Sequence, residues 1–204
     1  MALERTLAGF EHVNRYWDKT RNCIAAKILP GEYYVTTLQN EVIITVLGSC
    51  IAVCIRDPCA KIAGMNHFML PYNPSKSDTN SPERYGLWAM ESLINNMIKH
   101  GANKQNFEVK VFGGGHVLQH ATSINIGDKN IDFVQSFFRT EDITVLASDV
   151  GGRYGRKIVF SPPTGIAKVK HITTFKTNTV DVREDAYLSS ILSKPSSGEI
   201  ELFE

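Results

Sequence analysis

Two apolar stretches that meet at a Gly-Ser pair constrain the fold of this chain more than any other feature of its sequence. Val42–Leu47 is a nearly continuous apolar run, Gly48 and Ser49 interrupt it, and Cys50–Ile55 resumes it. Short apolar runs bounded by Gly, Ser, Asp and Pro are typical of strands that are buried on both faces. The chain must therefore bury these strands inside a sheet covered by other elements.

The rest of the chain alternates between strand-like and helix-like segments. Further strands are predicted by β-branched, aromatic and alternating residues at 32–38, 61–70, 107–112, 143–150, 156–160 and 165–172. A first helix is predicted from Ser81 as N-cap and Pro82 at the first position to a stop at Gly101, with the apolar face Leu87, Met90, Ile94, Met97 and Ile98. A second helix is predicted over Gly127–Arg139, with the stripe Ile131, Val134, Phe137 and Phe138. This pattern indicates an α+β fold with β-sandwich-like sheets flanked by helices.

The chain divides into three parts by composition. Residues 1–27 are mixed and polar, and we expect a partly helical N-terminal extension there. Residues 28–172 hold the predicted strands and helices and form the main domain. Residues 173–204 are polar, and we expect a loosely ordered C-terminal tail.

Charge and cysteine content narrow the possible functions. Lys and Arg number 22 against 21 Asp and Glu, so the net charge of +1 gives no strong field for nucleic acid or an anionic membrane. The N-terminus does not read as a signal peptide, and no run is long enough to span a bilayer, which favours a cytoplasmic protein. The four cysteines are then expected to stay reduced, and without CxxC pairs they predict no structural metal site.

Cys50 and His67 are the best candidates for chemistry. A cysteine that directly follows a Gly-Ser bend can present its thiol to a substrate, and it needs a base to become a nucleophile. His67 stands near the end of the next predicted strand, so the two side chains can meet. Free cysteines are commonly core residues, and a histidine at a strand end is commonly just hydrogen-bonded. Local pattern alone leaves both readings open.

Three weaker signals accompany this pair. Thr45 can orient the imidazole through its hydroxyl, although threonine is also an ordinary strand residue. The glycines at 113–115 lack the spacing of a phosphate loop and predict a close backbone approach to a neighbour or to the substrate chain. His116 and His120 are four residues apart without a supporting metal motif, and Lys168, Lys170, His171 and Lys176 predict a solvated strand face.

Longer blocks of sequence resemble the CheD family of chemoreceptor glutamine deamidases. The blocks are 45–58 (TVLGSCIAVCIRDP) and 64–71 (GMNHFMLP), then 29–35 (LPGEYYV), 110–115 (KVFGGG), 126–130 (IGDKN) and 149–157 (DVGGRYGRK). The resemblance extends over roughly residues 28–169, which is most of the main domain, and the blocks stand in the family's order.

The resemblance implies a fold related to the catalytic domain of deamidating bacterial toxins, and a hydrolase that needs no cofactor. Such a protein converts glutamines on methyl-accepting chemotaxis receptors to glutamate, with some activity on glutamyl methyl esters, and meets the membrane only through the receptor. Some members bind a CheC-type phosphatase, so such a partner is expected here too. The competing hypotheses are a non-catalytic adaptor that binds receptor or phosphatase, and a cysteine esterase.

The family's cysteine and histidine correspond to Cys50 and His67. Some members carry a threonine six residues before the cysteine, where this chain has Ile44, and Thr45 stands five before. Either the Thr45 hydroxyl or a backbone carbonyl then orients the imidazole. We expect substrate contacts from Ser49, Asn66, Gly113 and Gly114.

Overall fold

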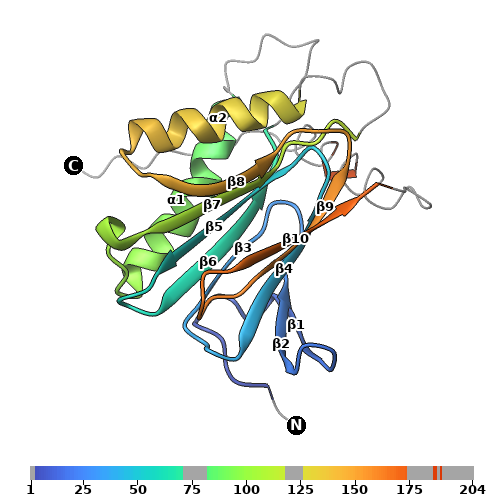
Figure 1. Ribbon diagram of the computed structural model, residues 1–204. Helices are drawn as coiled ribbons and strands as arrows, with labels where there is room; N and C mark the ends of the chain where they lie inside the picture. The colour runs from blue at the N-terminus through green and yellow to red at the C-terminus, as the bar shows by residue number, and fades with distance from the viewer. Residues whose placement is uncertain (1–2, 71–81, 118–125, 174–185, 188, 190–204) are drawn as a thin grey trace.

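Two five-stranded sheets pack face to face, and two helices lie against the outer face of one of them (Figure 1). The computed structural model describes residues 3–70, 82–117, 126–173, 186–187 and 189. The α+β class and the sandwich flanked by helices are confirmed. The main hydrophobic core runs through both sheets and under the helices.

The first sheet has the order β1-β2-β4-β9-β10. Its strands are β1 (Asn14–Asp18), β2 (Cys23–Lys27), β4 (Glu41–Leu47), β9 (Gly155–Phe160) and β10 (Ala167–Ile172). β2 and β4 run parallel, and the other neighbours are antiparallel.

The second sheet has the order β3-β6-β5-β7-β8. Its strands are β3 (Tyr33–Thr36), β6 (Ile62–Phe68), β5 (Ile51–Asp57), β7 (Glu108–Gly113) and β8 (Val145–Val150). β7 and β8 run parallel, and the other neighbours are antiparallel.

The Gly-Ser bend is the place where the chain crosses from one sheet to the other. β4 lies at the centre of the first sheet and β5 at the centre of the second, and residues 48–50 join them. Most side chains of both strands are buried, because each strand has a neighbour on both sides. β5 also lies between the other sheet and α2, whereas Val42 and Val46 of β4 are only half-buried. The predicted buried strands are confirmed, and Cys50 lies at the crossing.

Helices α1 (Pro82–Lys99) and α2 (Ile126–Thr140) match the two predicted helices, and a short 3₁₀ turn η1 (Lys104–Asn106) follows α1. Pro82 is the first residue of α1, as predicted, while Ser81 lies outside the described residues. The predicted apolar face of α1 is partly wrong. Leu87 and Ile98 are exposed, and Leu93 is buried instead, because the helix rests on β3 and β6 along a narrower stripe.

The N-terminal extension expected over residues 1–27 is wrong for its second half. Residues 14–27 form the hairpin of β1 and β2, and β2 pairs in parallel with β4. Ile24 and Ala25 are buried, so the hairpin completes the first sheet rather than preceding the domain. Of the expected C-terminal tail beyond residue 172, the structure describes residue 173 and three further positions, among which Tyr187 packs against the core.

Candidate active site

His67 lies on β6, and Cys50 directly precedes the neighbouring strand β5. His67 is the direct partner of Ala52 on β5, and Cys50 stands two residues before Ala52. Continuing the β5–β6 register one residue beyond β5 makes Cys50 a diagonal neighbour of His67, a relation with a typical Cα separation of about 7–8 Å. Both side chains are enclosed, with 0% of Cys50 and 1% of His67 exposed.

The His67 ring is held from the other sheet by Thr45. The Thr45 hydroxyl lies 2.7 Å from Nδ1 of His67 and donates its own hydrogen to the carbonyl of Ile28 at 3.0 Å. Because that hydroxyl hydrogen is already given to Ile28, Thr45 accepts from His67, which assigns the proton of the neutral ring to Nδ1. The Thr45 hydroxyl thus contacts the imidazole, as the sequence predicts, and the backbone carbonyl of Ile28 accepts the hydroxyl hydrogen.

Burial keeps this imidazole neutral. The pKa of His67 is lowered from 6.5 to about 3, because desolvation penalises the charged ring. With Nδ1 protonated, Nε2 carries the lone pair, and within the described part of the chain this atom is buried without a hydrogen-bond partner. Nε2 is therefore the ring atom that can accept a proton, although the lowered pKa makes this ring a weaker base than a solvated imidazole.

The glycine loop after β7 lies directly against the Cys50 connection. Gly114 and Gly115 donate from their backbone N–H groups to the carbonyls of Cys50 and Gly48, both at 2.8 Å. At Gly113 the backbone has φ +116°, and a Cβ would lie 2.0 Å from the Cys50 oxygen. The predicted close backbone approach is therefore made to the cysteine segment. A substrate contact from Gly113 or Gly114 stays a prediction.

Asn130 on α2 secures both sides of the site. Its carboxamide donates to the carbonyl of Ser49 and accepts from the N–H of Leu70, each at 2.8 Å, and it is fully buried. The Ser49 hydroxyl donates to the sulfur of Met69 at 3.6 Å. These contacts tie the segment before β5 to the segment after β6. Asn130 is the last residue of the 126–130 block of the resemblance, but no local pattern indicates these contacts.

Asn66 points away from His67. Its carboxamide accepts from the N–H of Val53 and donates to the carbonyl of Ala89, so it lies between β5 and α1. Alternation along β6 requires this, because His67 faces the other sheet. The predicted substrate contact of Asn66 has no support in this placement.

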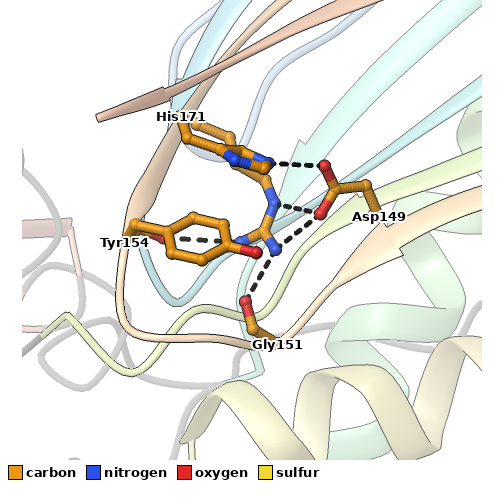
Figure 2. A network of polar contacts seen from close by, with 5 residues as sticks. Asp149, Gly151, Tyr154 and His171 are labelled. Atoms are coloured by element: carbon orange, nitrogen blue, oxygen red, sulfur yellow. Dashed lines mark hydrogen bonds and ion pairs between the residues drawn. The ribbon is translucent and has the colours of Figure 1, made fainter. Parts of the chain in front are cut away.

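A second polar network joins β8, β9 and β10 next to Gly151 (Figure 2). The Arg156 side chain is 0% exposed, and its Nε and Nη2 both donate to Oδ1 of Asp149 at 3.0 and 2.8 Å. Nη2 also donates to the carbonyl of Gly151 at 2.7 Å, and His171 Nε2 lies 2.7 Å from Oδ2 of Asp149. The ring of Tyr154 lies beside both the guanidinium and the imidazole.

The Arg156 network lies close to Gly115, whose N–H donates to the carbonyl of Gly48. A Cβ at Gly115 would lie 2.6 Å from the backbone carbonyl oxygen of Tyr154 and 3.5 Å from Nη1 of Arg156. Burial raises the carboxyl pKa of Asp149, but hydrogen bonds from His171 and Arg156 outweigh it, and the net pKa is lowered. The 149–157 block was visible as a resemblance, yet no local pattern in it showed this network.

The remaining histidine and lysine predictions are placed as follows. His116 Nε2 lies 2.9 Å from Asp128, and His120 is outside the described residues. Lys168 and Lys170 are exposed on β10 as predicted, Lys176 is not described, and His171 joins the Asp149 network. The described residues hold no cluster of three or more side chains that could bind a metal ion. None of the helices described there is long and apolar enough to cross a membrane.

Comparison with known proteins agrees with the sequence resemblance. Residues 69–171 match the family model CheD, described as CheD chemotactic sensory transduction. A protein of Saccharophagus degradans named probable chemoreceptor glutamine deamidase CheD is 46% identical over 98% of this chain and 94% of its own length. One of Methylobacillus flagellatus with the same name is 51% identical over 93% of this chain and 95% of its own.

Solved structures are more distant. The crystal structure of Neisseria meningitidis protein NMB0706 has a TM-score of 0.34 and 8% identity, covering 59% of this chain and 52% of that chain, too little to support any argument. The sequence relatives span nearly all of both chains at high identity. On this ground, the chain belongs to the CheD family.

Proposed function

We propose that this chain hydrolyses the side-chain amide of glutamines on chemoreceptors, giving glutamate and ammonia, with Cys50 as nucleophile. The names of its relatives supply the reaction and the class of substrate. The observation that carries the residue assignment is the Ile28–Thr45–His67 hydrogen-bond chain, which leaves Nε2 as the basic atom of a ring on the strand next to the Cys50 segment.

The first half-reaction forms a thioester. Nε2 of His67 takes the proton of the Cys50 thiol as the sulfur bonds to the carboxamide carbon of the substrate. The protonated ring then gives this proton to the amide nitrogen, the C–N bond breaks, and ammonia leaves. Backbone N–H groups near Cys50 are the proposed donors to the oxyanion, where losing one donor commonly costs about 2.7–4 kcal/mol.

The second half-reaction returns the enzyme to its starting state. Nε2 takes a proton from water as the water oxygen bonds to the thioester carbon. The C–S bond breaks, the sulfur takes the proton back from His67, and glutamate is released. Thr45 accepts from Nδ1 throughout, so the ring keeps its orientation while its charge changes.

Two finer parts of the proposal rest on the family resemblance. Glutamyl methyl esters fit the same two steps, with methanol leaving instead of ammonia. A CheC-type phosphatase is the proposed protein partner, and co-elution of the two purified proteins on gel filtration tests it.

The test of the reaction uses the purified chain and the cytoplasmic part of a chemoreceptor. Conversion of receptor glutamine to glutamate is read by mass spectrometry of tryptic peptides, and a glutamyl methyl ester peptide is assayed in parallel. We expect conversion with the natural chain and with Cys59→Ser, whose thiol is exposed, and none with Cys50→Ala. Conversion that survives in Cys50→Ala overturns the nucleophile, and receptor binding without conversion by any variant favours the adaptor.

A further inference from the structure

The candidate site is closed in this structure. Neither the Cys50 thiol nor the His67 ring is more than 1% exposed. A glutamine side chain that protrudes from another protein cannot reach an enclosed sulfur unless a covering residue moves. The residue that covers the site therefore decides which side chains gain access to it.

Tyr187, from the C-terminal part of the chain, packs at the border of this site. Its ring packs against Gly31, where a Cβ would lie 2.7 Å from the Tyr187 hydroxyl oxygen. Gly31 in turn donates its N–H to the carbonyl of His67 at 2.7 Å, and the N–H of His67 donates to the carbonyl of Glu32. Tyr187 thus lies on the segment that borders His67.

Tyr85 is the partner that holds Tyr187 in place. The two hydroxyl groups are hydrogen-bonded to each other, and both residues are half-buried. Tyr85 belongs to α1, and its ring lies 6.2 Å from that of Trp88 on the same helix. Tyr85 is therefore the anchored half of the pair, whereas Tyr187 reaches it from a segment 102 residues away in sequence.

Both hydroxyls also lie within electrostatic reach of Cys50. Burial raises the pKa of Tyr85 and of Tyr187, and negative charge on Cys50 raises both further. The tyrosine pair, the His67 border and the thiol therefore share one small region. This agrees with the contacts that Tyr187 makes at Gly31 and at Tyr85.

We propose that Tyr187 controls substrate access: its bond to Tyr85 closes the Cys50–His67 site, and a glutamine side chain reaches the thiol only when the two hydroxyls part. The proposal rests on the proposed deamidase function for its substrate. Closure itself is a property of the free protein, and it is measured without any receptor.

The experiment measures the rate at which iodoacetamide labels Cys50, read by mass spectrometry of the tryptic peptides. The variants are Tyr187→Ala and Tyr187→Phe, with Tyr16→Ala as the matched control because Tyr16 is exposed on β1. Cys54 is fully buried and Cys59 is exposed, so they serve as internal references for an intact fold and for reagent reactivity.

We expect Tyr187→Phe to label Cys50 about three- to tenfold faster than the natural chain, the range that loss of one neutral hydrogen bond gives. Tyr187→Ala should exceed tenfold, since the covering ring is also lost, and Tyr16→Ala should match the natural chain. Equal Cys50 rates in the natural chain and in both Tyr187 variants overturn the proposal. If Tyr187→Ala also labels Cys54, its fold has opened, and Tyr187→Phe alone decides.

The same samples separate this proposal from the function on which it rests. Faster Cys50 labelling in the Tyr187 variants, with no receptor glutamine converted by any protein, supports closure and contradicts the deamidase. Conversion by the natural chain, with Cys50 labelling unaffected by either variant, supports the deamidase and contradicts closure.

Discussion

Two histidines of this chain each hold a polar partner at 2.7 Å, in opposite surroundings. His67 is buried between the sheets and contacts the hydroxyl of Thr45, whereas His171 is 44% exposed at its side chain and contacts the carboxylate of Asp149. Burial without a counter-charge keeps the His67 ring neutral. The same contact distance therefore belongs to an enclosed neutral ring in the first case and to an exposed hydrogen bond with a carboxylate in the second.

The difference also explains what each cluster braces. The His67 cluster joins the two sheets through Thr45 and Ile28 and leaves Nε2 for chemistry. In the His171 cluster, Arg156 donates to the carboxylate of Asp149 and to the carbonyl of Gly151 (Figure 2). We expect changes in the His67 cluster to alter the reaction rate. We expect changes in the His171 cluster to alter the stability of the protein around Gly151.

Replacing each histidine by glutamine gives the largest expected contrast. His67→Gln should lower kcat for receptor deamidation by about 10²–10⁴-fold, because it removes the proposed general base. His171→Gln should change kcat by less than about threefold, since a lost surface pair contributes about 0–1 kcal/mol. Steady-state kinetics on a receptor fragment measures both. An equal decrease of kcat in the two variants would contradict the different roles of the two histidines.

Removing the Thr45 hydroxyl should have the next largest effect on rate. Thr45→Val leaves Nδ1–H of His67 without its acceptor, and losing such an orienting partner commonly lowers activity about 10–100-fold. Thr45→Ser keeps the hydroxyl and should restore most of kcat. The measurement is kcat for the three proteins, and a Thr45→Val enzyme as fast as the serine variant contradicts the orienting role.

Breaking the His171 cluster should lower the free energy of unfolding. Asp149→Asn leaves the buried Arg156 guanidinium without its counter-charge, which we expect to lower the free energy of unfolding by about 1–3 kcal/mol at pH 7. The Asp149 pKa is lowered from 3.8, so its contribution is present above that pH and is lost as the pH falls through the folded-state value. Urea unfolding measures the free energy of unfolding of both proteins at pH 7 and below pH 4. The difference between the natural chain and Asp149→Asn should be smaller at the lower pH.

The buried histidine should make the fold acid-sensitive in a different window. The pKa of His67 is about 3 in the folded protein, against 6.5 for an ordinary histidine. Between these two pH values the unfolded chain binds a proton at His67 and the folded chain does not. The free energy of unfolding therefore falls as pH drops from about 6.5 towards 3, by up to about 1.4 kcal/mol per pH unit from this group. His67→Gln should flatten that slope. Equal slopes for both proteins contradict a neutral buried ring.

The sequence predicted the elements near Cys50 well because their signals are local. Two apolar runs divided by Gly48 and Ser49 indicate buried strands wherever the sheets lie, and β4 and β5 agree. The pairing of Cys50 with His67 followed from consecutive strands. That β4 and β5 belong to different sheets was not predictable, because strand order depends on pairing across long distances.

The missed residues act through partners far away in sequence. Asn130 bonds to a carbonyl 81 residues before it, and Tyr187 bonds to a hydroxyl 102 residues before it. The β1–β2 hairpin was mistaken for a partly helical extension, because its polar residues face solvent along an edge strand and mask the burial of β2. No local pattern separates such residues from ordinary surface or core positions.

The protonation of the His67 ring tests the central claim most directly. Imidazole ¹⁵N chemical shifts of the ¹⁵N-histidine-labelled protein, with His67 assigned by comparison with His67→Gln among the six histidines, report which nitrogen carries the proton. The account predicts a neutral ring at pH 7, protonated at Nδ1 and bare at Nε2. A ring protonated at Nε2, or at both nitrogens, would contradict it.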